Sequence, residues 1–304
     1  MTVRDLGYRP YDGPRNPPST SVWVMLRYGL GRAWASWLVR LAALTSWLPV
    51  IALAVASIAA NNVAPMLRTD IPPEFPLAWM ADLVRDMADE RKSVGMLFAL
   101  EVWFFTTLVT AGAGASAIAD DLTHRAFQFY FAKPMTAAHY LAGRVGAIAL
   151  WVFAVVLAPA SLYLVVMALF GPDTERLDTL ALLLPVTLFA LVLGVVLGSV
   201  AVAVSSLSKS RALTMSLWLT LFIVPHVIAL IVDGVARLAG RADGFPWFYL
   251  GSFTSLLDVV RRALFNVDAE SPLRWFHAAP TLAIMVGLVL WLAHHRIVRQ
   301  DVIT

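Results

Sequence analysis

The sequence predicts an all-α polytopic membrane protein, and three observations support this fold class. Of the 304 residues, 60% are hydrophobic and only 14% are charged, whereas soluble domains are about 45–50% apolar and about 25% charged. The mean hydropathy is +0.74. The apolar residues also gather in six long runs, and a helix needs roughly 20 such residues to cross a bilayer. Each run must be helical, because lipid cannot satisfy an open backbone.

The N-terminal part of the chain predicts a tail followed by a helix on the membrane surface. Residues 1–20 are polar and rich in proline, with no apolar core of a signal peptide, and we expect them to form a disordered cytoplasmic tail. Residues 21–40 place tryptophans and leucines near one stripe and arginines nearer the other face, as in a helix that lies in the headgroup region. The alternative is that this segment extends the first span.

Residues 21–304 are predicted to form a single transmembrane domain. Its six expected spans are approximately residues 41–60, 95–119, 145–170, 179–204, 212–232 and 279–295. If the N-terminus is inside, the inside segments carry more than twice as many basic as acidic side chains, and the outside loops carry slightly more acidic ones. By the positive-inside rule both termini are expected in the cytoplasm.

A long outer loop, residues 234–278, precedes the sixth span. Its apolar residues at 253, 256, 257, 260 and 264 follow a helical stripe. We expect a helix here that either dips into the outer leaflet or caps the bundle.

No enzyme or metal site is predicted in this chain. It has no cysteine, and it contains neither a phosphate-binding GxxxxGK[ST] loop nor the HExxH and GxSxG motifs. The net charge of +3 is too small to suggest nucleic-acid binding. We therefore expect no catalytic residue and no bound cofactor.

A few residues within the spans are candidates for helix packing or for a transport pathway. A carboxylate in lipid is costly and indicates function, so Glu101 in the second run is one candidate; a position near the outer headgroups is the alternative. His226, which follows Pro225 in the fifth run, is expected to make an interhelical hydrogen bond. The small residues of the second and fourth runs favour close helix packing; the glycines concerned are Gly112, Gly194 and Gly198.

The polar connector DDLTHRAFQFYFAKPMTAAHYLAGR, residues 120–144, displays unusual aromatic surface. Phe127, Tyr130 and Phe131 share a helical face, while Phe129 points elsewhere. The aromatic face could lie on lipid, or both faces could bind a partner protein, because aromatic residues are enriched at protein interfaces. The residues alone leave both possibilities open.

Here the chain resembles the transmembrane subunits of ABC type-2 transporters. The features concerned are Asp120 and Asp121 at the exit of the second run, the amphipathic stretch Ala126 to Phe131, Lys133-Pro134, Thr136, Tyr140, Gly143 and Arg144. The overall layout of spans agrees with this resemblance. One departure is Ala126, where relatives often carry glycine.

The resemblance implies a dimeric permease of the bacterial inner membrane, either a homodimer or a pair of related chains. Each copy would bind a separately encoded ATPase, which carries the ATP and magnesium. Segment 120–140 is similar to the coupling helix that docks on that ATPase. The docking residues implied are Asp120, Asp121, Arg125, Phe127, Phe129, Tyr130, Phe131, Lys133 and Pro134.

Other functions compete with the ATP-driven exporter. An ion-coupled secondary transporter would use Glu101, but it also requires further intramembrane charges and usually a repeat, and no repeat is visible. A membrane anchor that recruits an ATPase without transport is a further alternative.

Overall fold

The computed structural model of the chain describes residues 20–63, 86–87, 90–131, 135–170, 176–241, 244, 246–267 and 273–302. Within these residues all regular structure is helical. The predicted tail lies outside the described residues except for Thr20, which begins α1 (Thr20–Ala35). Lys133 and Pro134 also lie outside them.

Five helices of the described chain are long and apolar enough to cross a membrane. They correspond to the first, third, fourth, fifth and sixth predicted spans. In chain order they are Trp37–Asn61 (α2, Trp37–Thr45, and α3, Trp47–Val63), Ala137–Phe170 (α9), Arg176–Ser205 (α10, Arg176–Ala181, and α11, Leu183–Ser205), Arg211–Leu238 (α12) and Trp275–Arg299 (within α14, Trp275–Val302).

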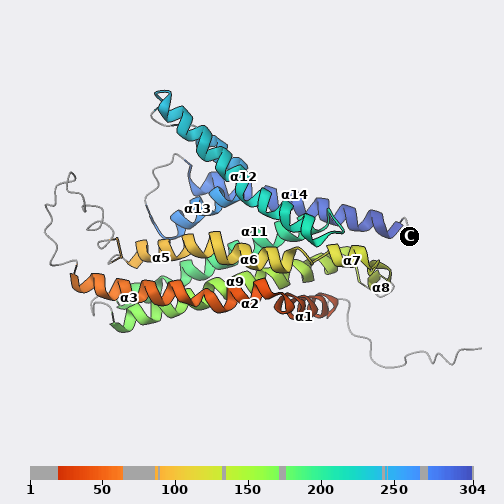
Figure 1. Cartoon of the computed structure of the whole chain (residues 1–304), viewed down its shortest axis with the longest axis horizontal. Helices are drawn as coiled ribbons and strands as arrows, with labels where there is room; N and C mark the ends of the chain where they lie inside the picture. Colours follow the sequence, from red (N-terminus) through yellow and green to blue (C-terminus); the bar gives the residue numbers. More distant parts are fainter. Residues whose placement is uncertain are drawn as a thin grey trace, which may run out of the picture.

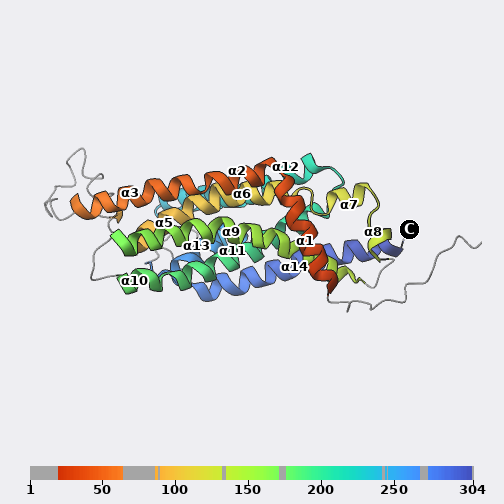
Figure 2. The same ribbon diagram turned by 90° about the horizontal axis from the view of Figure 1, so that it is seen from below.

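The predicted surface helix, residues 21–40, is divided at Ser36. Ser36 has extended backbone angles of φ −71° and ψ 128°, so α1 ends before it and Trp37 begins the first long helix. Figure 2 shows α1 running across the long helices rather than along them. The assignment of Trp37 and Arg40 to the surface helix was therefore wrong, because the bend falls at a serine that the apolar periodicity does not mark.

The second predicted span is not a regular α-helix. It consists of α5 (Glu90–Leu100), the π-helix η2 (Glu101–Phe105), α6 (Thr106–Val109), the π-helix η3 (Thr110–Gly114), a turn, and α7 (Ala119–Thr123). The run AGAGASA at residues 111–117 provides little side-chain packing to hold one helical register, and π-helical turns often occur at functional sites. These segments nevertheless continue one another along the bundle (Figure 1).

Helix α9 lies at the centre of the bundle, where it packs most extensively against α11 and α1. Glycines make these close approaches possible. A Cβ atom on Gly194 would lie 2.6 Å from the carbonyl oxygen of Ala149, and one on Gly198 would lie 3.1 Å from that of Val145. Gly143 of α9 faces α1 in the same way, against Val22. Helices α9 and α11 therefore touch through their backbones.

The predicted helix in the outer loop is α13 (Phe253–Leu264), which follows the 3₁₀-helix η5 (Pro246–Gly251). Phe253, Leu256 and Leu257 are buried, and α13 packs against α14 and α11. The predicted apolar stripe thus faces the bundle. Helix α12 diverges from the other long helices, so that its C-terminal half extends away from them (Figure 1).

Candidate functional site

Two adjacent carboxylates, Asp120 and Asp121, are buried at one end of the bundle. Their exposed fractions are 6% and 3%, although both lie on the short helix α7. Burying an ionised carboxylate is costly unless charged and hydrogen-bonded partners surround it. The partners come from three other helices and define what we call the ion cluster: Arg32, Asp120, Asp121, Tyr140, Arg144 and Arg211.

Asp121 faces the interior of the bundle. It accepts a hydrogen bond of 2.6 Å from the hydroxyl of Tyr140 and forms an ion pair with Arg144, both on α9. The Arg144 side chain is only 2% exposed, and its guanidinium lies over the rings of Tyr28 and Tyr140, at 5.2 and 5.3 Å from their centroids. This half of the cluster is closed to solvent.

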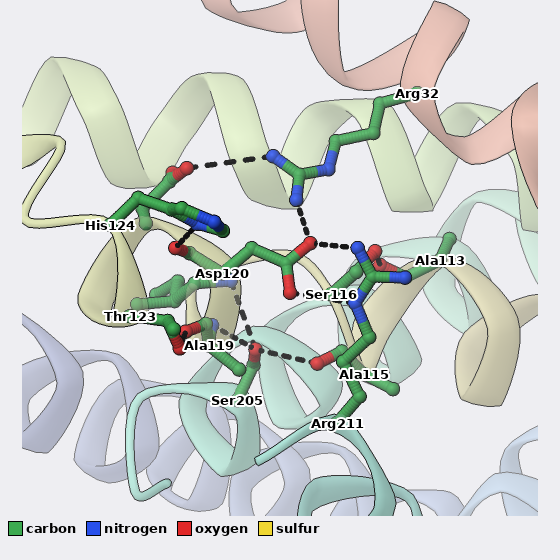
Figure 3. A network of polar contacts seen from close by, with 12 residues as sticks. Arg32, Ala113, Ala115, Ser116, Ala119, Asp120, Thr123, His124, Ser205 and Arg211 are labelled. Atoms are coloured by element: carbon green, nitrogen blue, oxygen red, sulfur yellow. Dashed lines mark hydrogen bonds and ion pairs between the residues drawn. The ribbon is translucent and has the colours of Figure 1, made fainter. Parts of the chain in front are cut away.

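Asp120 faces the edge of the bundle and joins two further helices. It pairs with Arg32 of α1 and with Arg211, whose Nε donates a hydrogen bond of 2.6 Å. Figure 3 shows the carboxylate between the two guanidinium groups. Arg211 is the first residue of α12, and its side chain is 67% exposed. This half of the cluster is therefore accessible.

Ser205 at the end of α11 fixes the start of α7. Its hydroxyl accepts hydrogen bonds from the backbone N–H groups of Ile118 and Ala119, at 2.9 and 3.0 Å, as seen for Ala119 in Figure 3. The hydroxyl of Thr123 donates 2.8 Å to the carbonyl of Lys209. Helix α7 is thus attached to the loop between α11 and α12 as well as to the ion cluster.

The aromatic helix α8 (Phe127–Phe131) packs beside Tyr140. Phe127 is 6% exposed; it stacks on Phe131 at 5.8 Å and meets Tyr140 edge-on at 5.3 Å. Partial burial, with a smaller effect of the Asp121 charge, raises the pKa of Tyr130. Phe129 alone among the described aromatic residues of this helix is exposed, at 73%.

The described residues among the predicted docking residues differ in exposure. Tyr130 and Phe131 are half-buried. Asp120, Asp121 and Phe127 point into the protein, where they bind other parts of the same chain. Phe129 and Arg125 are exposed, and Arg125 has a positive φ of 52° in the turn between α7 and α8. Any surface that this segment offers to a partner therefore centres on the exposed pair.

The predicted pathway residues bring the second and fifth runs together. His226 of α12 shares a hydrogen bond of 2.8 Å with the hydroxyl of Ser255 on α13, and its ring lies 4.8 Å from that of Trp103 in η2. It follows Pro225, which lies within α12. Glu101 begins η2, but its side chain lies outside the described residues.

Gly112 belongs to η3, at the bend between α1 and α2. A Cβ atom at this position would lie 2.7 Å from the hydroxyl oxygen of Ser36. Gly112 therefore lets the second run approach the bend closely. In the part of the chain that the structure describes, no three His, Asp or Glu side chains group as ligands for a metal ion.

Sequence reasoning missed Arg32 and Arg211 as members of the site. Arg32 lies 88 residues from Asp120 along the chain, and Arg211 lies 91 residues from it, so no local spacing marks either. Tyr140 and Arg144 were noted only as motif residues. Their separation of four places both on one helical face, which is a signal for a shared partner.

Comparison with known families identifies a model that covers most of this chain. The family model described as "ABC-2 family transporter protein" matches residues 34–296, which includes all members of the ion cluster except Arg32 and covers most of the chain. The search of curated proteins gave no match.

Proposed function

The chain belongs to the ABC-2 transporter family, and from this premise we propose that it is the permease subunit of an ATP-driven exporter whose ATPase is a separate chain. The absence of a phosphate-binding loop from the sequence supports this division of labour. The observation that carries the proposal is the attachment of α7 to α1, α9 and α12 through the ion cluster, together with the packing of α8 on Tyr140 of α9.

The ion cluster offers a route for mechanical coupling. Force applied to α8 would reach α9 through the contact of Phe127 with Tyr140 and the bonds of Asp121. It would reach α12 through the pair of Asp120 with Arg211, and α1 through Arg32. A small displacement of the segment would therefore act on several helices at once, because packed elements transmit rather than absorb strain.

The proposed permease has six spans. The segments α5 to α7 together serve as the second span, since they continue one another along the bundle (Figure 1). Both termini would then lie on the same side of the membrane, and the basic side chains that gather there support a cytoplasmic position for that side. The inner membrane of a bacterium is the setting that the family resemblance implies.

The proposed permease acts as a dimer. Helix α12 supports this, because its described surface carries exposed leucine, isoleucine and valine side chains along most of its length. By analogy with the family we expect the dimer interface and the pathway near the second and fifth spans, where Trp103 meets His226 and Phe222. The exposed side chains of that region are largely apolar, which suits a transported molecule with apolar parts.

Purification of the intact complex tests this function. The tagged chain is extracted from its native host in a mild detergent, and the intact mass and ATPase activity are measured. We expect two permease chains with two copies of a soluble ATPase. A folded chain that carries no ATPase would contradict the proposal and favour an ion-coupled transporter, which mutation of Glu101 would then test.

A further inference from the structure

Helix α1 exposes one complete face beside the ion cluster. Its opposite face is buried through Met25, Gly29 and Ala33, which pack toward α9. Because α1 runs across the long helices (Figure 2) and leads through Ser36 into the first of them, it has the orientation of a helix that lies in the plane of the membrane surface.

The exposed face of α1 lines a shallow, open groove. Its walls combine aromatic, aliphatic and cationic side chains, which are Trp23, Val24, Arg27, Tyr28 and Arg32. Trp23 is 63% exposed and Val24 is 60% exposed. Gly31 faces open space in the groove, because a Cβ atom there would meet no other atom within 4 Å.

The charge around this groove is positive and incompletely balanced. The ion cluster contains three guanidinium groups, of Arg32, Arg144 and Arg211, but only two carboxylates. Arg27 adds a fourth cation, and among the described residues no carboxylate pairs with it. Helix α1 itself contains no acidic residue. An anion bound in the groove would neutralise part of this excess positive charge.

We propose that this groove binds the headgroup of an anionic membrane phospholipid. Arg27 and Arg32 hold the phosphate, and Trp23 and Val24 pack against the first part of the acyl chains. A lipid is the occupant because cations and apolar side chains alternate within one short groove on a surface helix, which is the arrangement that retains an amphiphile with a negative head.

The site would also connect the lipid to the ion cluster. Arg32 lines the groove and at the same time pairs with Asp120 and lies 3.5 Å from Asp121. A phosphate bound to Arg32 competes with Asp120 for the same guanidinium group. Bound anionic lipid therefore weakens the ion pair between Arg32 of α1 and Asp120 of α7.

Two variants test the site in different ways. Arg27→Gln removes a cation that no described carboxylate pairs with, and Gly31→Trp fills the groove without changing its charge. Arg299→Gln is the matched control, because Arg299 is an exposed cation near the end of α14, away from the groove. Each full-length protein is placed in nanodiscs of equal parts phosphatidylcholine and phosphatidylglycerol, and the lipids that remain bound after transfer to detergent are measured by native mass spectrometry.

We expect the wild-type chain and Arg299→Gln to retain phosphatidylglycerol in preference to phosphatidylcholine. Both groove variants should lose this preference, by about fivefold for the loss of one arginine near an anionic headgroup. Unchanged retention in both groove variants would overturn the proposal. An equal loss in Arg299→Gln would also overturn it, since it would indicate a diffuse surface charge. Exclusion of the lipid from the wild-type chain by its co-purified ATPase would assign the groove to that protein instead.

Discussion

Tyr140 donates a hydrogen bond of 2.6 Å to the carboxylate of Asp121, which joins the central helix α9 to the end of the second run. The same ring supports Phe127 of α8 at 5.3 Å. One residue thus holds both the buried charge and the aromatic helix that follows it. Changes at this point should act on stability and on coupling together, whereas changes at the exposed half of the cluster should separate the two effects.

Asp121→Asn should destabilise the protein far more than Asp120→Asn. The first change leaves Arg144, at 2% exposure, without its carboxylate, and breaking a buried pair costs about 3–5 kcal/mol. The second leaves Arg211, which is 67% exposed and remains hydrated, and Arg32, which still lies 3.5 Å from Asp121. A loss of about 1 kcal/mol is therefore expected. Thermal unfolding followed by size-exclusion chromatography in detergent measures both.

Asp178→Asn serves as the control for these two variants, because Asp178 is an exposed aspartate on α10. It should unfold at the wild-type temperature. Equal losses for the Asp120 and Asp121 variants would contradict the division of the cluster into a closed and an accessible half.

The sequence predicts the long helices well, because a bilayer demands apolar length and hydropathy records it directly. It does not predict the bend at Ser36 or the two π-helical turns. These depend on which backbone hydrogen bonds form, and alanine and glycine at residues 111–117 permit several patterns.

The candidate site, like the fold, could be predicted from the sequence only in part. Asp120 and Asp121 stand out because charge at the end of an apolar run is conspicuous. Their partners do not, since Arg32 and Arg211 reach Asp120 only after α1 and α12 have packed beside α7. Burial of Phe127 against Tyr140 likewise depends on tertiary structure, which distinguishes it from Phe129 although the two lie only two residues apart.

Gly194→Ala should destabilise the contact between α9 and α11. The added methyl group would lie 2.6 Å from the carbonyl oxygen of Ala149, and this atom belongs to the backbone and cannot rotate away. Overpacking of this kind costs about 1–3 kcal/mol. The loss is measured by thermal unfolding in detergent.

Gly287→Ala on α14 is the control, because its methyl group would meet nothing within 4 Å, and it should be neutral or slightly stabilising. Similar behaviour of the two variants would show that α9 and α11 are less closely packed than described.

Single cysteines should report the predicted topology, since the natural chain contains none. Lys92, Leu207 and Leu238 are suitable positions because each is exposed. With a membrane-impermeant maleimide on intact spheroplasts, we expect labelling of Lys92→Cys and Leu238→Cys but not of Leu207→Cys, which should react only after permeabilisation. Labelling of Leu207→Cys in intact spheroplasts would invert the orientation. Protection of Lys92→Cys would show that the segments α5 to α7 do not complete a crossing.

Phe129→Asp should release the proposed ATPase partner without disturbing the permease fold. Phe129 is 73% exposed, so a carboxylate there meets water when the chain is alone, but it would be desolvated against an apolar cleft when the partner binds. A loss of at least about tenfold in affinity is expected for an aromatic anchor at an interface. The measurement is the amount of ATPase that co-purifies with the tagged permease. Phe170→Asp provides a matched control, because Phe170 is 68% exposed and ends α9 at the far end of the bundle from α8 (Figure 2).

Phe127→Asp is a different experiment: it places a charge beside Tyr140 in the interior and should lower the unfolding temperature of the permease itself. Retention of the ATPase by a folded Phe129→Asp chain, at the level of the Phe170→Asp control, would show that the partner binds elsewhere, and the exposed aromatic ring of α8 would then have to be explained by contact with lipid.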